Sequence, residues 1–204
     1  MKAIDIHAHI PRMPGLDEYG IEPGLRRMFK IDGKPDDVGK MVETYRAIDT
    51  MAVIFSVDAE TETGDKPDPN DYVAETVAAF PDVLLGFCTV DPRKGSLAVK
   101  ELERSVTELG LRGLKLHPIH QGFFPDDPIY VPLFTKAVEL GIPVLMHSGY
   151  AAAGAGAPGG GGFQLAYSRP IPHVDSLAAR HPDLTIIMAH PAWPWIQEQI
   201  AVAL

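Results

Sequence analysis

The chain has a single cysteine, Cys88, among its 204 residues. One thiol cannot form a disulfide within the chain, and this favours a reducing, cytoplasmic setting. Apolar runs are short, and none approaches the ~20 residues that cross a bilayer. Asp5 and the histidines that follow it interrupt any apolar region of a signal peptide. The formal net charge is −9, and no arginine-rich segment offsets it, so we expect no membrane and no nucleic-acid partner.

What the chain does contain is a repeated pattern of short apolar runs, each followed by a helical stretch. Its length suits a single domain over residues 1–204. Strands are expected at 3–9, 52–57, 83–89, 111–117, 142–147 and 184–190, and helices at 39–49, 70–80, 96–109, 131–140, 173–180 and 193–203. This α/β alternation predicts a parallel sheet covered by helices. An open doubly wound sheet and a closed (β/α)8 barrel both satisfy it.

Two long loops interrupt the pattern, at residues 11–39 and 151–170. We expect both to shape a binding pocket, since long loops in compact domains are usually functional. Residues 154–159 match G-x-G-x-x-G, but no strand directly precedes them and Pro158 lies inside the motif. The segment therefore predicts an active-site loop and not a dinucleotide site.

Five of the eight histidines lie where a predicted strand ends. They are His7, His9, His117, His147 and His190. Both architectures place active sites at the carboxyl ends of parallel strands, so these imidazoles are expected to meet. Neutral imidazole suits zinc, iron, nickel or manganese, and zinc is the commonest choice.

The first strand places Asp5, His7 and His9 on one face, because alternate residues of a strand point the same way. Adding His147 gives three protein ligands and leaves a position for water, the arrangement of a catalytic metal. Such a metal lowers the pKa of bound water toward ~7 or polarises a substrate oxygen. His190 is then either a fourth ligand or a general acid/base, and we favour the second role.

Lys115 and His117 share one face of the fourth predicted strand. Either they bind substrate or support the ligands, or they only form structural hydrogen bonds at the strand end. His120 follows in an expected loop, where we predict that it is solvated.

Four motifs carry a family resemblance. They are Ile-Asp-Ile-His-Ala-His at 4–9, Gly-Leu-Lys-Leu-His-Pro at 113–118, Val-Leu-Met-His-Ser-Gly at 144–149 and Ile-Met-Ala-His-Pro at 187–191. In order and spacing they resemble the amidohydrolase-related family of the amidohydrolase superfamily, in the branch that includes aminocarboxymuconate-semialdehyde decarboxylase. The resemblance implies a (β/α)8 TIM barrel with a divalent metal, usually zinc. It implies that His7, His9 and His147 are ligands, that His190 acts on substrate or water, and that the protein is a homo-oligomer.

The pattern departs from the family after the sixth predicted strand. Family members carry an aspartate at the end of strand eight, and a (β/α)8 barrel takes about 250 residues. The sequence here stops at Leu204. We therefore expect a barrel truncated after six β/α units, or one that another copy completes.

Three functions are consistent with these residues. The first is a metal-dependent hydrolase of a small-molecule substrate, with His190 as the proton shuttle. The second is a non-oxidative decarboxylase of an aromatic or unsaturated carboxylic acid, which needs a cationic group for the carboxylate. Arg26, Arg27 and Arg169 are the candidates for that group, and Arg169 is the one we select. The third is a non-catalytic metal-binding barrel.

Overall fold

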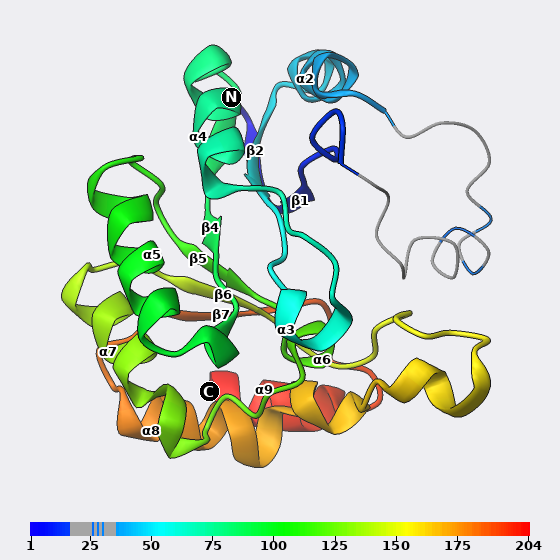
Figure 1. Cartoon of the computed structure of the whole chain (residues 1–204), viewed down its shortest axis with the longest axis vertical. Helices are drawn as coiled ribbons and strands as arrows, with labels where there is room; N and C mark the ends of the chain where they lie inside the picture. Colours follow the sequence, from blue (N-terminus) through cyan, green and yellow to red (C-terminus); the bar gives the residue numbers. More distant parts are fainter. Residues whose placement is uncertain (17–25, 27, 29, 31–35) are drawn as a thin grey trace.

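A computed structural model describes residues 1–16, 26, 28, 30 and 36–204, and it alternates strands with helices along the chain (Figure 1). The strands are Ala3–His9 (β1), Thr50–Phe55 (β2), Leu84–Gly86 (β3), Cys88–Thr89 (β4), Leu114–Leu116 (β5), Val144–His147 (β6) and Ile186–Ala189 (β7). The α-helices are Val38–Ala47 (α2), Glu60–Thr63 (α3), Asn70–Ala79 (α4), Ser96–Thr107 (α5), Pro118–Gln121 (α6), Val131–Glu139 (α7), Asp175–Arg180 (α8) and Ile196–Ala203 (α9). Short 3-10 and π turns are Pro92–Lys94 (η1), Pro128–Tyr130 (η2), Pro158–Gly162 (η3), Leu165–Ser168 (η4) and Pro170–Val174 (η5).

The third predicted strand is present but divided by Phe87 into β3 and β4. β3 completes a parallel sheet of order β1-β2-β3, and β4 begins a second parallel sheet of order β4-β5-β6-β7. The Phe87 N–H donates to the Ile54 carbonyl at 3.0 Å, and the Cys88 N–H donates to the Gly113 carbonyl at 2.8 Å. The chain thus changes partner across one residue, and the two sheets follow one another in a single curved array.

The helices form an outer layer over this array. α2 and α4 pack against β2 and β3, while α5 packs against β4 and α7. Figure 1 shows α5, α7 and α8 together on one side of the second sheet. The segment predicted as a long loop at 11–39 lies largely outside the described residues.

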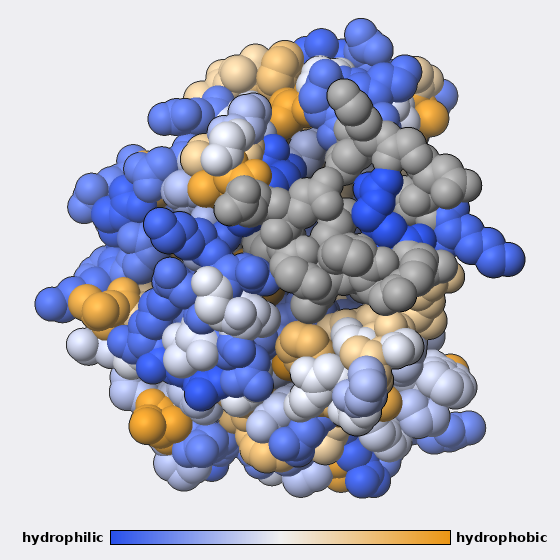
Figure 2. Space-filling model, turned by 45° about the vertical axis from the view of Figure 1, so that its right-hand side comes forward, coloured by the Kyte–Doolittle hydropathy of each residue, from blue (hydrophilic) through white to orange (hydrophobic). Residues whose placement is uncertain are grey.

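The visible surface is mostly hydrophilic on the face of Figure 2, with hydrophobic residues in small separate patches outside the grey atoms. None of the described helices is long and apolar enough to cross a bilayer. Cys88 is buried, and burial raises the pKa of its thiol to about 12. A single domain over residues 1–204 stays a prediction.

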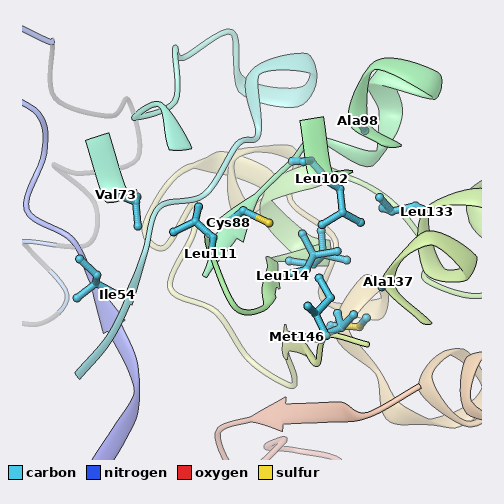
Figure 3. Close-up of a cluster of buried hydrophobic side chains, with 14 of the residues drawn as sticks. Ile54, Val73, Cys88, Ala98, Leu102, Leu111, Leu114, Leu133, Ala137 and Met146 are labelled. Carbon is cyan, nitrogen blue, oxygen red and sulfur yellow. The ribbon is translucent and has the colours of Figure 1, made fainter. Parts of the chain in front are cut away.

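Alternate residues of each strand face two different layers. Toward the helices, Leu114 and Met146 are fully buried against Leu102 of α5 and Ala137 of α7 (Figure 3). The opposite faces meet in a smaller inner cluster, formed by Val53, Phe55, Phe87, Leu145 and Ala189. Because side-chain direction alternates along a strand, Lys115 and His147 belong to the inner face. The fold therefore places these two polar side chains on the inside, at the carboxyl ends of β5 and β6.

Candidate metal centre

β1 ends in a β-bulge that directs its histidines. Pairing with β2 passes from Asp5↔Ala52 to Ala8↔Ile54, so β1 carries one extra residue there. A bulge re-aims the side chains beside it. The His7 N–H donates to Oδ1 of Asp5 at 2.9 Å, and the Tyr45 hydroxyl donates to Oδ2 at 2.7 Å. The regular alternation of side-chain direction predicted for this strand is thus interrupted. Asp5 is held by hydrogen bonds from its own strand and from Tyr45 of α2.

The two histidines of β1 converge. Nε2 of His7 lies 3.3 Å from Nε2 of His9. Two nitrogens bound at 2.0–2.1 Å to one tetrahedral zinc ion are about 3.3 Å apart. Burial, with the charge of Lys115, lowers the pKa of His7 to about 3 and that of His9 well below its usual value. Both imidazoles are therefore neutral at pH 7, which is the form that binds metal, and the pair fits two adjacent ligands of a divalent ion.

His147 lies at the buried end of β6, but its Nε2 is 3.2 Å from the Tyr150 carbonyl oxygen. Since a carbonyl only accepts, the N–H is assigned to Nε2 in this arrangement. Within residues 1–16 and 36–204 and the three isolated positions described, no three His, Cys, Asp or Glu side chains form a group that could hold a metal. His147 as the third ligand stays a prediction, and it requires a different ring orientation.

His190 follows β7 and lies between the other histidines. Its ring centroid is 4.4 Å from that of His7 and 5.0 Å from that of His147. Its φ of 69° is in the left-handed region, which is uncommon for a residue other than glycine. The His190 side chain is exposed to solvent. Its partial desolvation, together with the charge of Lys115, lowers its pKa. This position would suit a proton donor or acceptor beside a metal, and that role of His190 stays a prediction.

Lys115 is the least exposed polar residue of the site. Its side chain is 0% exposed, with Nζ 3.1 Å from Nε2 of His7 and 4.8 Å from the centre of the Phe55 ring. In the described part of the chain no carboxylate forms an ion pair with it. Burial lowers its pKa to about 7. Lys115 therefore changes charge near neutral pH, directly against a predicted ligand.

His117 is the middle ring of a stack. It lies 3.8 Å from His120 and 4.0 Å from His147 between ring centroids, with planes within 8° of parallel. The main-chain N–H of His117 donates to Oε1 of Gln121 at 2.8 Å. The prediction that His120 is solvated was wrong: residues 118–121 form the short helix α6, which turns this ring back onto His117 and buries its Nε2. Substrate binding by His117 stays a prediction.

Arg169 is not brought to the histidines. Its guanidinium forms a bidentate ion pair with Glu198 of α9, the shortest contact being 2.6 Å, and lies 5.9 Å from the Trp195 ring. To bind a substrate carboxylate it would have to leave Glu198. Of the other two candidates, Arg27 lies outside the described residues.

The buried histidines predict a fold that weakens in mild acid. Burial lowers the pKa of His147 to about 3 and that of His120 to about 4, whereas unfolded histidine titrates near 6.5. Between pH 6.5 and 4 the unfolded chain binds more protons, so stability falls as pH falls, by up to about 1.4 kcal/mol per pH unit and histidine. Urea unfolding with EDTA at pH 7.5, 6 and 5 measures this. A constant midpoint over that range would contradict it.

One family model, described as amidohydrolase, matches residues 4–203. The chain belongs to the amidohydrolase family. Among curated relatives, it is 31% identical over 78 residues to 2-amino-3-carboxymuconate-6-semialdehyde decarboxylase of Dictyostelium discoideum, covering 38% of this chain and 22% of that protein. It is 33% identical over 86 residues to 2-keto-4-carboxy-3-hexenedioate hydratase of a Sphingobium species, covering 38% and 25%. These matches span about a quarter or less of the relatives' length.

Solved structures identify the architecture. An uncharacterised TIM-barrel protein of Bordetella bronchiseptica superposes with a TM-score of 0.74 and 25% identity, over 98% of this chain and 70% of that one. The amidohydrolase chain described here is therefore a TIM-barrel α/β structure, and the doubly wound alternative is excluded. 5-Carboxyvanillate decarboxylase of Novosphingobium aromaticivorans has the same fold, with a TM-score of 0.52 and 18% identity over 90% and 62% of the two chains. That structure contains manganese.

Proposed function

We propose that this chain forms the metal-dependent site of an enzyme that removes CO2 from an aromatic or unsaturated carboxylic acid. The observation that carries the proposal is the charge of the site. Lys115 is buried with Nζ 3.1 Å from Nε2 of His7, and, in addition to their burial, its charge lowers the pKa of each of the five strand-end histidines. Asp5, the acidic residue of β1, already accepts two hydrogen bonds. A site with cationic and N–H groups in excess attracts a carboxylate.

The curated relatives support decarboxylation more than hydrolysis, which the sequence put first. One is a decarboxylase of a carboxymuconate semialdehyde, and another is a hydratase of a carboxyhexenedioate. Both names describe unsaturated carboxylic acids. Hydrolysis by a metal-activated water uses the same residues and is the second candidate.

The proposed reaction breaks the bond between the carboxyl carbon and the adjacent carbon, which keeps the electron pair and gains a proton. His190 is proposed to deliver that proton, because it lies between His7 and His147 and is open to solvent. Lys115 is proposed to orient the carboxylate and offset its charge. His7, His9 and His147 would hold the metal, for which zinc is the sequence-based choice and manganese that of a solved neighbour. A bound divalent ion would polarise a substrate oxygen.

Product analysis in deuterated water tests this proposal. The chain is incubated with Mn²⁺ or Zn²⁺ and 2,6-dihydroxybenzoate, the ligand of one solved neighbour. We expect CO2 and a product with one deuterium in place of the carboxylate, and we expect EDTA to stop the reaction. His190→Asn should slow it by about 10²–10⁴-fold. Hydrolysis of a test ester or lactone without CO2 from any acid would instead support the hydrolase.

The remaining predictions concern the setting of the enzyme. We propose a small-molecule substrate, a cytoplasmic location and a homo-oligomeric assembly. The free, buried thiol of Cys88 is compatible with a reducing compartment.

A further inference from the structure

The candidate site is divided between the two sheets. His7 and His9 belong to β1 of the first sheet, whereas Lys115, His147 and His190 lie on or directly after strands of the second. The two halves meet where Nζ of Lys115 lies 3.1 Å from Nε2 of His7. The geometry of the site therefore depends on how the carboxyl ends of the two sheets are held against each other.

Main-chain pairing between the sheets stops before it reaches the site. The pairing of β2 with β3 ends at Ile54↔Gly86, and the Phe87 N–H still donates to the Ile54 carbonyl at 3.0 Å. From Cys88 onward the chain pairs with β5 instead. Beyond this point, hydrogen bonds of buried side chains join the residues that follow β2 to the second sheet.

Gln121 of α6 is the first of these side chains, and it is 0% exposed. Its Nε2 donates to the carbonyl of Asp58, which follows β2, at 2.7 Å and to the carbonyl of Val90, which follows β4, at 2.8 Å. Its Oε1 accepts from the main-chain N–H of His117, which follows β5, at 2.8 Å. A carbonyl only accepts and an N–H only donates, so these partners fix the orientation of the amide. Gln121 thus joins the ends of three strands, one from the first sheet and two from the second.

Thr89, at the end of β4, adds a second bridge between the sheets. Its hydroxyl accepts from the Asp58 N–H at 3.1 Å and donates to the Lys115 carbonyl at 3.2 Å. The Asn70 side chain in turn holds the N–H and the carbonyl of Thr89, both at 2.9 Å. This bridge leads from the residue after β2 to the lysine whose amine contacts His7.

We propose that Gln121 is a positioning residue which, together with Thr89, holds the Lys115 half of the site against the His7 half. Its hydrogen bonds go to main-chain groups at the strand ends, so it acts on the reaction through the strands and not by touching substrate. A displacement of about 1 Å among reacting groups can lower a rate by about 10²-fold. The effect on rate rests on the proposed function, whereas the effect on the contact between Lys115 and His7 does not.

Gln121→Met and Thr89→Val test the effect on rate. Methionine has the length of glutamine without its amide, and valine has the shape of threonine without its hydroxyl. In the Mn²⁺-loaded chain with 2,6-dihydroxybenzoate, each variant should lower kcat by at least about tenfold. Because both bridges hold the same strand ends, the double variant should lose less than the product of the two single losses.

Leu184→Ala is the control for a general loss of stability. Leu184 is buried in the outer layer and precedes β7, at the opposite ends of the strands from the site. Its truncation removes core contacts, so the variant should have a lower Tm than the wild type. At a temperature where it is folded, its kcat should stay within about twofold of the wild-type value.

A spectroscopic signature reports the positioning without any turnover. In the chain labelled with ¹⁵N-histidine and freed of metal by EDTA, the Nε2 resonance of His7 is identified by its absence from His7→Asn. Lys115→Met gives the position of this resonance when the contact with the amine is lost. We expect Gln121→Met to move the resonance at least half-way toward that position, and Leu184→Ala to leave it at the wild-type position.

Two outcomes would overturn the positioning role of Gln121. One is a His7 resonance at the wild-type position in Gln121→Met, and the other is a loss of kcat no larger than that of Leu184→Ala. If Gln121→Met is unfolded by circular dichroism, Thr89→Val carries both measurements, with the same two outcomes. If the wild type releases no CO2, the proposed function fails, and the resonance alone decides the positioning role.

Discussion

Replacing His7 by alanine is expected to weaken Mn²⁺ or Zn²⁺ binding by at least ~100-fold and to stop CO2 release. The reason is geometric: Nε2 of His7 and Nε2 of His9 are 3.3 Å apart, the spacing of two ligands on one ion. Loss of a group that only supports a ligand already lowers metal affinity by about 10–100-fold, so loss of a ligand should cost at least as much. Calorimetric titration with each metal, and the metal content after dialysis, give the result.

His173→Ala is the matched control for this variant. His173 is also a partly buried histidine, but its Nδ1 lies 2.7 Å from Asp126, and it is outside the histidine group at the strand ends. It should bind metal as the wild type does. Equal metal affinity in His7→Ala and wild type, with both folded by circular dichroism, would remove His7 from the metal centre. It would also remove the basis of both enzymatic hypotheses.

Replacing Lys115 by methionine is expected to lower CO2 release by about 10²-fold or more while making the protein more stable. The loss follows from removal of the cationic group proposed to face the carboxylate, since one such donor contributes about 10²–10³-fold to rate. The gain in stability follows from burial. The side chain is fully buried with no ion pair to any residue that the structure describes, and methionine has a similar shape without the amine.

The pH dependence gives this stability prediction a sign. Lys115 has its pKa lowered by burial to about 7, whereas an unfolded lysine keeps its proton to about pH 10.5. Between pH 7 and 10.5 the unfolded chain binds more protons, so the wild type gains stability as pH rises. The advantage of Lys115→Met should be about 2–5 kcal/mol at pH 7 and below, and should shrink toward pH 10. Urea unfolding at pH 7, 8.5 and 10 measures it.

Lys94→Met should do the opposite. Nζ of Lys94 lies 2.8 Å from Asp58 and 2.9 Å from Glu60, and these partners raise its pKa. Its removal leaves the buried Asp58 carboxylate without its cation, so Lys94→Met should be less stable than the wild type. If both variants lost stability alike at pH 7, the inference that burial of the Lys115 amine lowers the stability of the fold would be wrong.

The strand ends were predictable from sequence because each is an apolar run that stops at a polar residue. His7, His9, His147 and His190 lie where that pattern placed them, at the ends of β1, β6 and β7. The division of the third strand was not predictable in the same way. It depends on Phe87 changing its hydrogen-bond partner from one sheet to the next, and local sequence carries no signal for that.

The details of the site depended on short-range structure that periodicity does not detect. The bulge between Asp5 and Ala8 puts one extra residue in β1 relative to β2, and the amino-acid composition of the strand does not reveal it. The sequence predicts a loop at α6 because four residues make little more than one helical turn, which is too short for a periodic hydrophobic pattern. The prediction for His120 was wrong for the same reason. The sequence did carry a signal for Phe55. It lies two residues after Val53 in β2, so both side chains are on the inner face, where the Phe55 ring lies beside Lys115.

A single amide on the outer helix α9 determines the main-chain path around His190. Nε2 of Gln199 donates to the His190 carbonyl at 2.7 Å, and Oε1 of Gln199 accepts from the Ala192 N–H at 2.8 Å. Only a side chain that donates and accepts at once can satisfy both groups. A glutamate at position 199 would keep the acceptor and place a charge against the carbonyl. The residue at position 199 of α9 is therefore constrained by the main chain around His190 as well as by its place in a helix.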